Sequence, residues 1–283
     1  MELPFSIRLT VIPLALVAIA VLLLINSYAH TGDFVARSFE LKGGTLVSVK
    51  LSQPVDISAV KQALQARFGD VAVNELSGLG GRSILINVDE SVDGKDVIAV
   101  LDSMGISTKD SSIQTLGATV GATFFSQAQT AMAFAFILMA IIIFSIFREP
   151  LPSFYMIFGA FSDMIITLGF MQLFGIELSL ASLGALLMLL GYSIDTDIMF
   201  TSRALKQKDN TSLMEKLRGS FKTGITMTGT AIVALAAILI TSISPVLVQI
   251  ASVLIIGLAA DIVVTWFLNA PLLNWYMKKR GRA

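Results

Sequence analysis

The sequence contains no cysteine and a single histidine, His30, in 283 residues. Disulfide bonds, thiolate metal sites and a cysteine nucleophile are therefore excluded, and a serine–histidine relay would depend on His30 alone. Charged residues are scarce as well, since they form only 14% of the chain. An average soluble protein has about 25%. The twenty basic and twenty acidic residues give a net charge of zero. Without a basic excess, we predict no nucleic-acid partner.

Hydrophobic residues are abundant instead, at 55% of the chain, and the mean hydropathy is +0.80. A helix that spans a membrane needs about 20 apolar residues. Apolar runs of this kind predict an α-helical membrane protein with a bundle of six transmembrane helices. They lie at 9–28, 128–147, 153–174, 178–201, 223–243 and 246–276. The last run is long enough to tilt or to continue along the membrane surface.

The first run has a second interpretation, because Ser27-Tyr28-Ala29 resembles a signal-peptide cleavage site. The apolar run from Leu9 to Ile25 is longer than the usual core of about 7–15 residues, which favours a retained anchor.

Lysine and arginine predict the orientation, because cytoplasmic loops are enriched in both. They gather in the loop 202–222 and in the C-terminal tail, whereas the short turns near 175–177 and 244–245 contain none. We therefore predict a cytoplasmic membrane protein whose two termini, loop and basic tail are cytoplasmic. The predicted division is a first helix over 1–28, an extracytoplasmic domain over 29–127 and a five-helix region over 128–283.

The extracytoplasmic segment has the pattern of a small α+β domain. Alternation and capping residues predict strands at 39–51, 71–76, 83–88 and 109–116, with helices at 56–68 and 93–104 and a glycine turn at 78–81. This order is that of a ferredoxin-like unit. Neither glycine cluster is followed by the Gly-Lys-Ser/Thr of a phosphate-binding loop, so we interpret both as turns or bulges. The domain is expected to be a contact surface.

Four aspartates fall inside the predicted spans: Asp163, Asp195, Asp197 and Asp261. Each costs about 2.5–3.5 kcal/mol at the centre of a membrane. The spans contain no lysine or arginine away from their ends, so a cationic partner is not evident within the chain. The aspartates must be protonated, face a wet cavity, bind cations or pair with another subunit. Protonated aspartates that join helices by hydrogen bonds are the simplest alternative.

The fourth span carries polar groups on two faces. At about 100° per residue, Asp195 and Asp197 point about 200° apart and cannot face one cavity on a regular helix. Ser193 and Thr201 share the face of Asp197, whereas Tyr192 and Ser202 share that of Asp195. A helix of this kind is expected near the centre of its bundle.

Enzyme motifs are incomplete. Gly191-Tyr192-Ser193 lacks the glycine that would follow in an intramembrane serine protease, and His30 lies outside the spans. Asp261 lacks the Gly-x-Gly that precedes an aspartyl protease carboxylate, and no His-Glu-x-x-His occurs. We predict no enzyme activity, no cofactor and no metal site.

Several motifs in order resemble the SecF family, accessory subunits of the protein-export channel. The resemblance lies in Phe161-Ser162-Asp163-Met164-Ile165-Ile166-Thr167-Leu168-Gly169-Phe170, Gly175-Ile176-Glu177-Leu178, Gly191-Tyr192-Ser193-Ile194-Asp195-Thr196-Asp197, Arg203, Lys42-Gly43-Gly44-Thr45 and Thr119-Val120-Gly121. The Asp195-Thr196-Asp197 triplet is similar to the archaeal branch, whereas bacterial relatives resemble Asn-Asp-Thr there.

The resemblance implies a subunit that pairs with SecD, associates with the SecY channel and assists export of polypeptides, with the proton gradient as the energy source. It makes Asp195 and Asp197 the leading candidates for proton coupling, with Asp163, Asp261 and Arg203 as supporting candidates. Two other functions remain open: an exporter of small molecules or lipids from the same superfamily, and a membrane scaffold that transports nothing.

Overall fold

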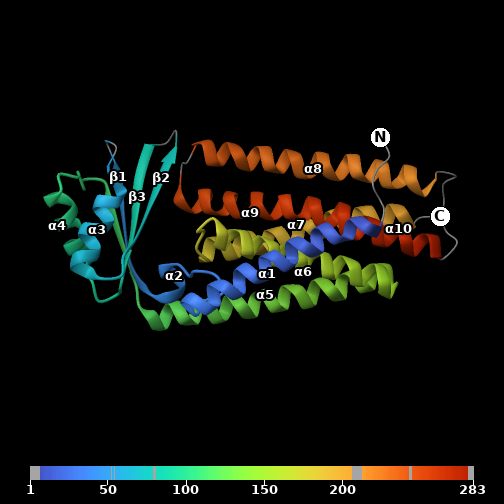
Figure 1. Cartoon of the computed structure of the whole chain (residues 1–283), viewed down its shortest axis with the longest axis horizontal. Coiled ribbons are helices and arrows are strands. Elements are labelled where there is room, and N and C mark those ends of the chain that lie inside the picture. The colour runs from blue at the N-terminus through green and yellow to red at the C-terminus, as the bar shows by residue number, and fades with distance from the viewer. Residues whose placement is uncertain are drawn as a thin grey trace.

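The computed structural model describes residues 7–51, 53, 55–78, 81–205, 212–241 and 244–279. A helical bundle occupies one end of an elongated molecule and a β-sheet the other (Figure 1). The elements in chain order are the 3₁₀-helix η1 (Ile7–Thr10), α1 (Val11–Thr31), α2 (Phe39–Lys42), β1 (Gly44–Leu51), α3 (Ile57–Phe68), β2 (Ala72–Gly78), β3 (Gly81–Val88), α4 (Gly94–Ser103), β4 (Ser111–Leu116), α5 (Ala118–Phe147), α6 (Pro150–Leu173), α7 (Leu180–Leu205), α8 (Leu213–Thr241), α9 (Pro245–Val264), the π-helix η2 (Thr265–Asn269) and α10 (Ala270–Lys279).

Six helical spans are long and apolar enough to cross a membrane, as predicted; the last is the continuous run α9–η2–α10. Two begin ten residues earlier than predicted, α5 at Ala118 and α8 at Leu213. A helix of 30 residues is about 45 Å long, whereas the hydrocarbon core is about 30 Å thick. The hydropathy pattern marks only the part in hydrocarbon, so the additional turns of these helices were missed.

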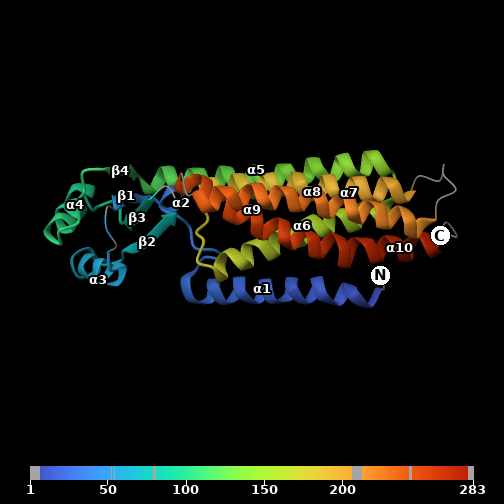
Figure 2. The ribbon, with the colours of Figure 1, turned by 90° about the horizontal axis from the view of Figure 1, so that it is seen from above.

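Helices α6, α7 and α9 contact one another and form the centre of the bundle. Helix α1 packs on α6, α5 on α6 and α7, and α8 on α7 and α9, so these three lie at the periphery (Figures 1 and 2). Small residues permit close approach. A Cβ added at Gly169 would lie 2.6 Å from Ala20 of α1, and one at Gly257 would collide with Leu189 of α7.

The sheet has the strand order β2-β3-β1-β4, with all neighbouring strands antiparallel. The predicted β-α-β-β-α-β order is confirmed. Asp56 caps α3 as expected, accepting from the amide of Ser58 at 2.9 Å, and Gly69 ends that helix. Helices α3 and α4 cover the face of the sheet that is turned away from the bundle (Figures 1 and 2). Of the predicted turn at 78–81, Leu79 and Gly80 lie outside the described residues.

The predicted strand over 39–51 is wrong in its first part. Phe39–Lys42 form the single helical turn α2, closed by a hydrogen bond from the amide of Gly43 to the carbonyl of Phe39, and β1 begins at Gly44. Leu41 is fully buried because α2 packs against the start of α5. This tertiary contact decides the local conformation.

Helix α2 joins the sheet to the bundle. Backbone hydrogen bonds connect Ser38 and Ala36 to Leu178, between α6 and α7, at 2.8 and 2.7 Å. The Glu40 carboxylate accepts a hydrogen bond from the amide of Leu180 at 2.9 Å, at the beginning of α7. One short segment therefore connects the first strand with the end of a central membrane helix.

The α2–α5 contact generates a prediction. Gly43 and Gly32 both have positive φ angles, but a Cβ at Gly43 would collide with the backbone of Ala118, whereas one at Gly32 meets nothing within 4 Å. Gly32 is in the left-handed region, where alanine costs about 1–2 kcal/mol. Gly43, with a ψ angle of 159°, is in a region that essentially only glycine adopts, where alanine costs roughly 1–3 kcal/mol. Gly43→Ala should lose a further ~1–3 kcal/mol to overpacking. We expect its Tm in detergent to fall roughly 3–10 °C below that of Gly32→Ala. Equal melting temperatures would contradict the α2–α5 packing.

Candidate functional site

Three of the four predicted intramembrane aspartates meet inside the bundle. Asp163 comes from α6, Asp197 from α7 and Asp261 from α9, and each side chain is 1% exposed. The three helices that carry them are the ones that form the centre of the bundle. Three acidic groups are thus enclosed together rather than distributed along the surface.

The carboxyl groups are connected by hydroxyls. Ser193 Oγ on α7 donates to Asp163 Oδ2 at 2.7 Å. Thr265 Oγ1 lies 3.3 Å from Asp197 Oδ1 and 3.2 Å from Asp261 Oδ1. A hydroxyl has one proton, so Thr265 donates to one of these two carboxylates at a time.

The Asp163 and Asp261 carboxyl groups lie close enough to interact electrostatically. Two carboxylates at such close range repel each other unless one of them carries a proton. The other oxygen of Asp163, Oδ1, is buried and has no hydrogen-bond partner within the described ranges. An unpartnered oxygen in this position can accept a further hydrogen bond.

Positive charge is absent from the surroundings of the cluster. Residues 150–202 and 223–277 contain no lysine, arginine or histidine. In the part of the chain that the structure describes, none of the ion pairs involves Asp163, Asp197 or Asp261. No group of acidic or histidine residues there has the arrangement of a metal site. Unpaired buried charges are costly, so a carboxyl group in this position depends on hydrogen-bond donors from neighbouring side chains.

The π-helix η2 brings Asn269 and Thr265 to the same carboxylate. Asn269 Nδ2 donates to Asp197 Oδ2 at 2.8 Å. Space for the amide comes from Gly159 on α6, where an added Cβ would lie 2.5 Å from Asn269 Nδ2. Trp266, within η2, is held edge-on between the rings of Phe200 and Phe221. Single π-turns inside α-helices are frequent at functional sites.

The other two predicted site residues lie elsewhere. Asp195 is exposed on the opposite face of α7, next to Tyr192, which is 46% exposed. Arg203 lies near the end of α7 and donates to Thr223 Oγ1 of α8 at 3.2 Å. The predicted angular separation of Asp195 and Asp197 is therefore present, and only Asp197 belongs to the cluster.

Sequence reasoning missed Asn269. An uncharged amide inside the long apolar run 246–276 is a polar group that needs a hydrogen-bond partner, but only the carboxylates in the spans were considered as site residues. Ser193 was predicted to share the face of Asp197 on its own helix, but it bonds to Asp163 of another helix. Spacing along one helix cannot reveal such a partner.

Comparison with known proteins identifies the family. Residues 96–279 match the family model described as protein export membrane protein SecD/SecF, C-terminal. The chain is 41% identical over 278 residues to the protein-export membrane protein SecF of Pyrococcus furiosus, a match that covers 96% of this chain and 92% of that one. The chain belongs to the SecF family.

Another SecF relative, from Methanothermobacter thermautotrophicus, is 39% identical and is matched over 93% of its length. Among solved structures, SecDF of Thermus thermophilus, a translocon-associated membrane protein, has the same fold, with a TM-score of 0.76 at 19% identity. That match covers 96% of this chain but only 38% of the SecDF chain. Membership in the SecF family assigns an accessory role in Sec-mediated protein export.

The Gly159–Asn269 contact generates the second prediction. Gly159→Ala should push the Asn269 amide away from Asp197, which removes a buried hydrogen bond worth about 0.5–1.5 kcal/mol. Gly229 on α8 is the matched control, because a Cβ there meets nothing within 4 Å. Alanine stabilises a helix relative to glycine by about 0.5–1 kcal/mol. We expect the Tm in detergent to fall in Gly159→Ala and to hold or rise in Gly229→Ala. Two variants with the same Tm would show that the contact is unimportant.

Proposed function

We propose that this chain acts with SecD to promote export across the cytoplasmic membrane, and that proton binding at Asp163, Asp197 and Asp261 drives its conformational changes. The observation that carries the proposal is the enclosed carboxyl cluster, which has no ion-pair partner among the residues that the structure describes. A charge change in such a place alters the free energy of packing of all three central helices. No enzymatic step and no cofactor are required, since the proton gradient supplies the free energy.

The exposed face of α7 is the proposed surface for SecD. Asp195 and Tyr192 are exposed there, and a Cβ at Gly191 would meet nothing within 4 Å. A carboxylate facing lipid is unfavourable, whereas a partner helix or a wet interface would accommodate it. The Thermus thermophilus structure is named SecDF, and this chain matches only 38% of that protein. The unmatched remainder supports a partner protein beside this chain in the membrane. Asp195 would then act at the interface with SecD.

The proposed orientation places both termini in the cytoplasm and the sheet outside. The start of α1 and the end of α10 lie at the end of the bundle opposite the sheet (Figure 1). Lys278 and Lys279 lie at the end of α10, and Lys216, Arg218 and Lys222 lie in the first turns of α8, which start near α10 (Figure 1). Basic residues favour the cytoplasmic side. On the outer side, the sheet would meet the polypeptide that emerges from the SecY channel.

Helix α2 provides a route from the cluster to the sheet. Glu40 caps the start of α7, and α7 carries Asp197 further along. A shift of α7 when the cluster gains or loses a proton would therefore be transmitted through α2 to β1. The direction is reciprocal, because a load on the sheet would change the proton affinity of the cluster by the same coupling free energy.

The test replaces the cluster carboxylates by amides of similar size. We expect Asp163→Asn and Asp197→Asn, each assembled with SecD and the channel in membranes, to lose most of the export that a proton gradient stimulates, while gradient-independent export continues. Asp70→Asn is the control, since Asp70 is exposed and lies outside the membrane-spanning helices. The double variant Asp195→Asn/Asp197→Asn should lose gradient stimulation at least as completely.

Normal gradient-stimulated export in the double variant would contradict the proposal that these aspartates couple export to proton binding. If the double variant also copurifies with SecD, the scaffold function would replace it. Loss of SecD on purification, with export lost at the same time, would assign the aspartates to assembly.

A further inference from the structure

A cavity of about 520 Å³ lies where the sheet meets the bundle. Helices α3 and α4 leave this face of the sheet bare, and the face is turned toward the ends of the membrane helices (Figures 1 and 2). Its walls come from three parts of the chain: the strands, helix α2, and the segments that begin α7 and α9. None of these residues belongs to the carboxyl cluster.

The floor of the cavity consists of two rows of side chains that run across the strands. The register places Leu46 between Asn87 and Gln114 in one row, and Leu85 and Ser48 between Asn74 and Ser112 in the other. Leucines therefore occupy the middle of the floor, and amides and hydroxyls surround them. Both rows line the cavity.

The opposite wall is held in place by hydrogen bonds. Gln249 of α9 donates to the carbonyl of Glu177 at 2.9 Å and accepts from Ser179 Oγ at 2.8 Å. The amide of this glutamine thus fixes the start of α9 to the segment before α7. Because these side chains are already held in place, little conformational entropy would be lost from this wall when a ligand binds.

The cavity carries no positive charge. The residues that line it include no lysine, arginine or histidine and two glutamates, Glu40 and Glu177. Burial raises the pKa of Glu177 above its ordinary value, and Lys42 partly opposes this. Phosphates and anionic headgroups would find no cationic partner among these lining residues. Within the described chain, Asn87 Oδ1 and Ser38 Oγ, both on lining residues, are buried without a hydrogen-bond partner.

We propose that this cavity binds a short extended stretch of the exported polypeptide through its main-chain amides. A peptide group offers one donor and one acceptor, and side-chain amides and hydroxyls can satisfy both regardless of sequence. The central leucines suit apolar side chains, and the two glutamates suit basic ones. The volume is in the range of about 300–1,000 Å³ that ligand sites have. The inference rests on the proposed role in export.

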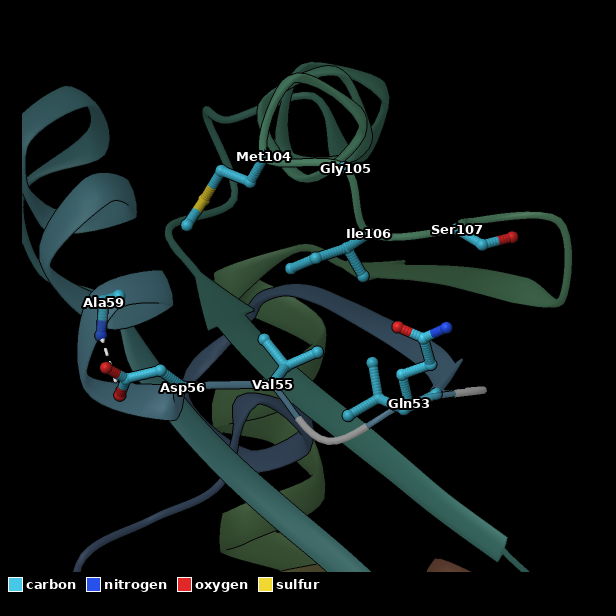
Figure 3. Close-up of a pocket in the computed structure, with 9 residues that line it drawn as sticks. Gln53, Val55, Asp56, Ala59, Met104, Gly105, Ile106 and Ser107 are labelled. Carbon is cyan, nitrogen blue, oxygen red and sulfur yellow. Dashed lines mark hydrogen bonds between the residues drawn. The ribbon is translucent and has the colours of Figure 1, made fainter.

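A second cavity, of about 440 Å³, serves as a control. It lies at the far end of the sheet domain, and Asp56, Met104 and Ile106 are among the residues that line it (Figure 3). The Asp56 carboxylate is occupied at the start of α3, where it accepts from the amide of Ala59 at 3.3 Å (Figure 3). None of the buried unpartnered side-chain atoms in the described chain belongs to its lining.

The experiment uses the absence of native cysteine. Ser112→Cys places a single thiol at the first cavity, and Ser107→Cys places one at the second; both serines are exposed. Each variant is assembled with SecD and the channel and is engaged with a stalled exported polypeptide that carries one cysteine. We expect thiol-to-thiol crosslinks at least several times more frequent from Ser112→Cys. Adding Asn74→Leu to Ser112→Cys should reduce them, because an amide is lost from the same row.

Equal crosslinking from the two cavities would overturn the proposal, and so would labelling of Ser112→Cys by a lipid with a thiol-reactive headgroup but not by polypeptide. The same crosslink in the Asp197→Asn background separates the two claims. Polypeptide bound there without gradient stimulation would confirm the cavity independently of proton coupling. Gradient-stimulated export with no crosslink would support proton coupling and contradict polypeptide binding in the cavity.

Discussion

A carboxyl group in the hydrocarbon region must be enclosed, and the packing of this bundle follows from that constraint. Each aspartate costs about 2.5–3.5 kcal/mol at the membrane centre unless other groups compensate. Here α6, α7 and α9 each contribute one, and they share hydroxyl and amide donors that no single helix supplies. Helices must approach closely to make such contacts, which explains Gly159 beneath the Asn269 amide and Gly257 against Leu189. The peripheral helices α1, α5 and α8 carry no buried acid and show mostly apolar surface.

The enclosed cluster and the sheet are linked through the helices themselves. Helix α9 carries Gln249 and Ser252 at the cavity and Asp261 nine residues further along, about 14 Å away. Leu254, Leu258 and Leu189 of α7 fill the layer between them, and all three are buried. Such a layer keeps water from the cluster and is rigid, because close-packed interiors transmit displacement rather than absorb it.

Much of this arrangement follows from the sequence, for reasons that are local. Apolar runs identify six spans because hydrocarbon imposes one length on them all, and Asp56 identifies the start of α3 because capping needs only neighbouring residues. The errors concern contacts between distant segments. Phe39–Lys42 are helical because of packing on α5, and Asn269 reaches Asp197 because η2 packs against α7. Asp195 and Asp197 were separated correctly by helical geometry, but only the folded bundle shows which of the two is enclosed.

The two faces of α7 have different surroundings, one buried in the bundle and one exposed. One face holds Asp197 among donors from its own chain, and the other exposes Asp195 where this chain provides no neighbour for Gly191. A change of charge or of contacts on either face would favour a shift of the whole helix against α5, α6, α8 and α9. Because Glu40 fixes the start of the same helix to the sheet, any such shift reaches the cavity as well. A proton, a membrane partner and a polypeptide would then act on one helix, and linkage requires that each alters the affinity for the others.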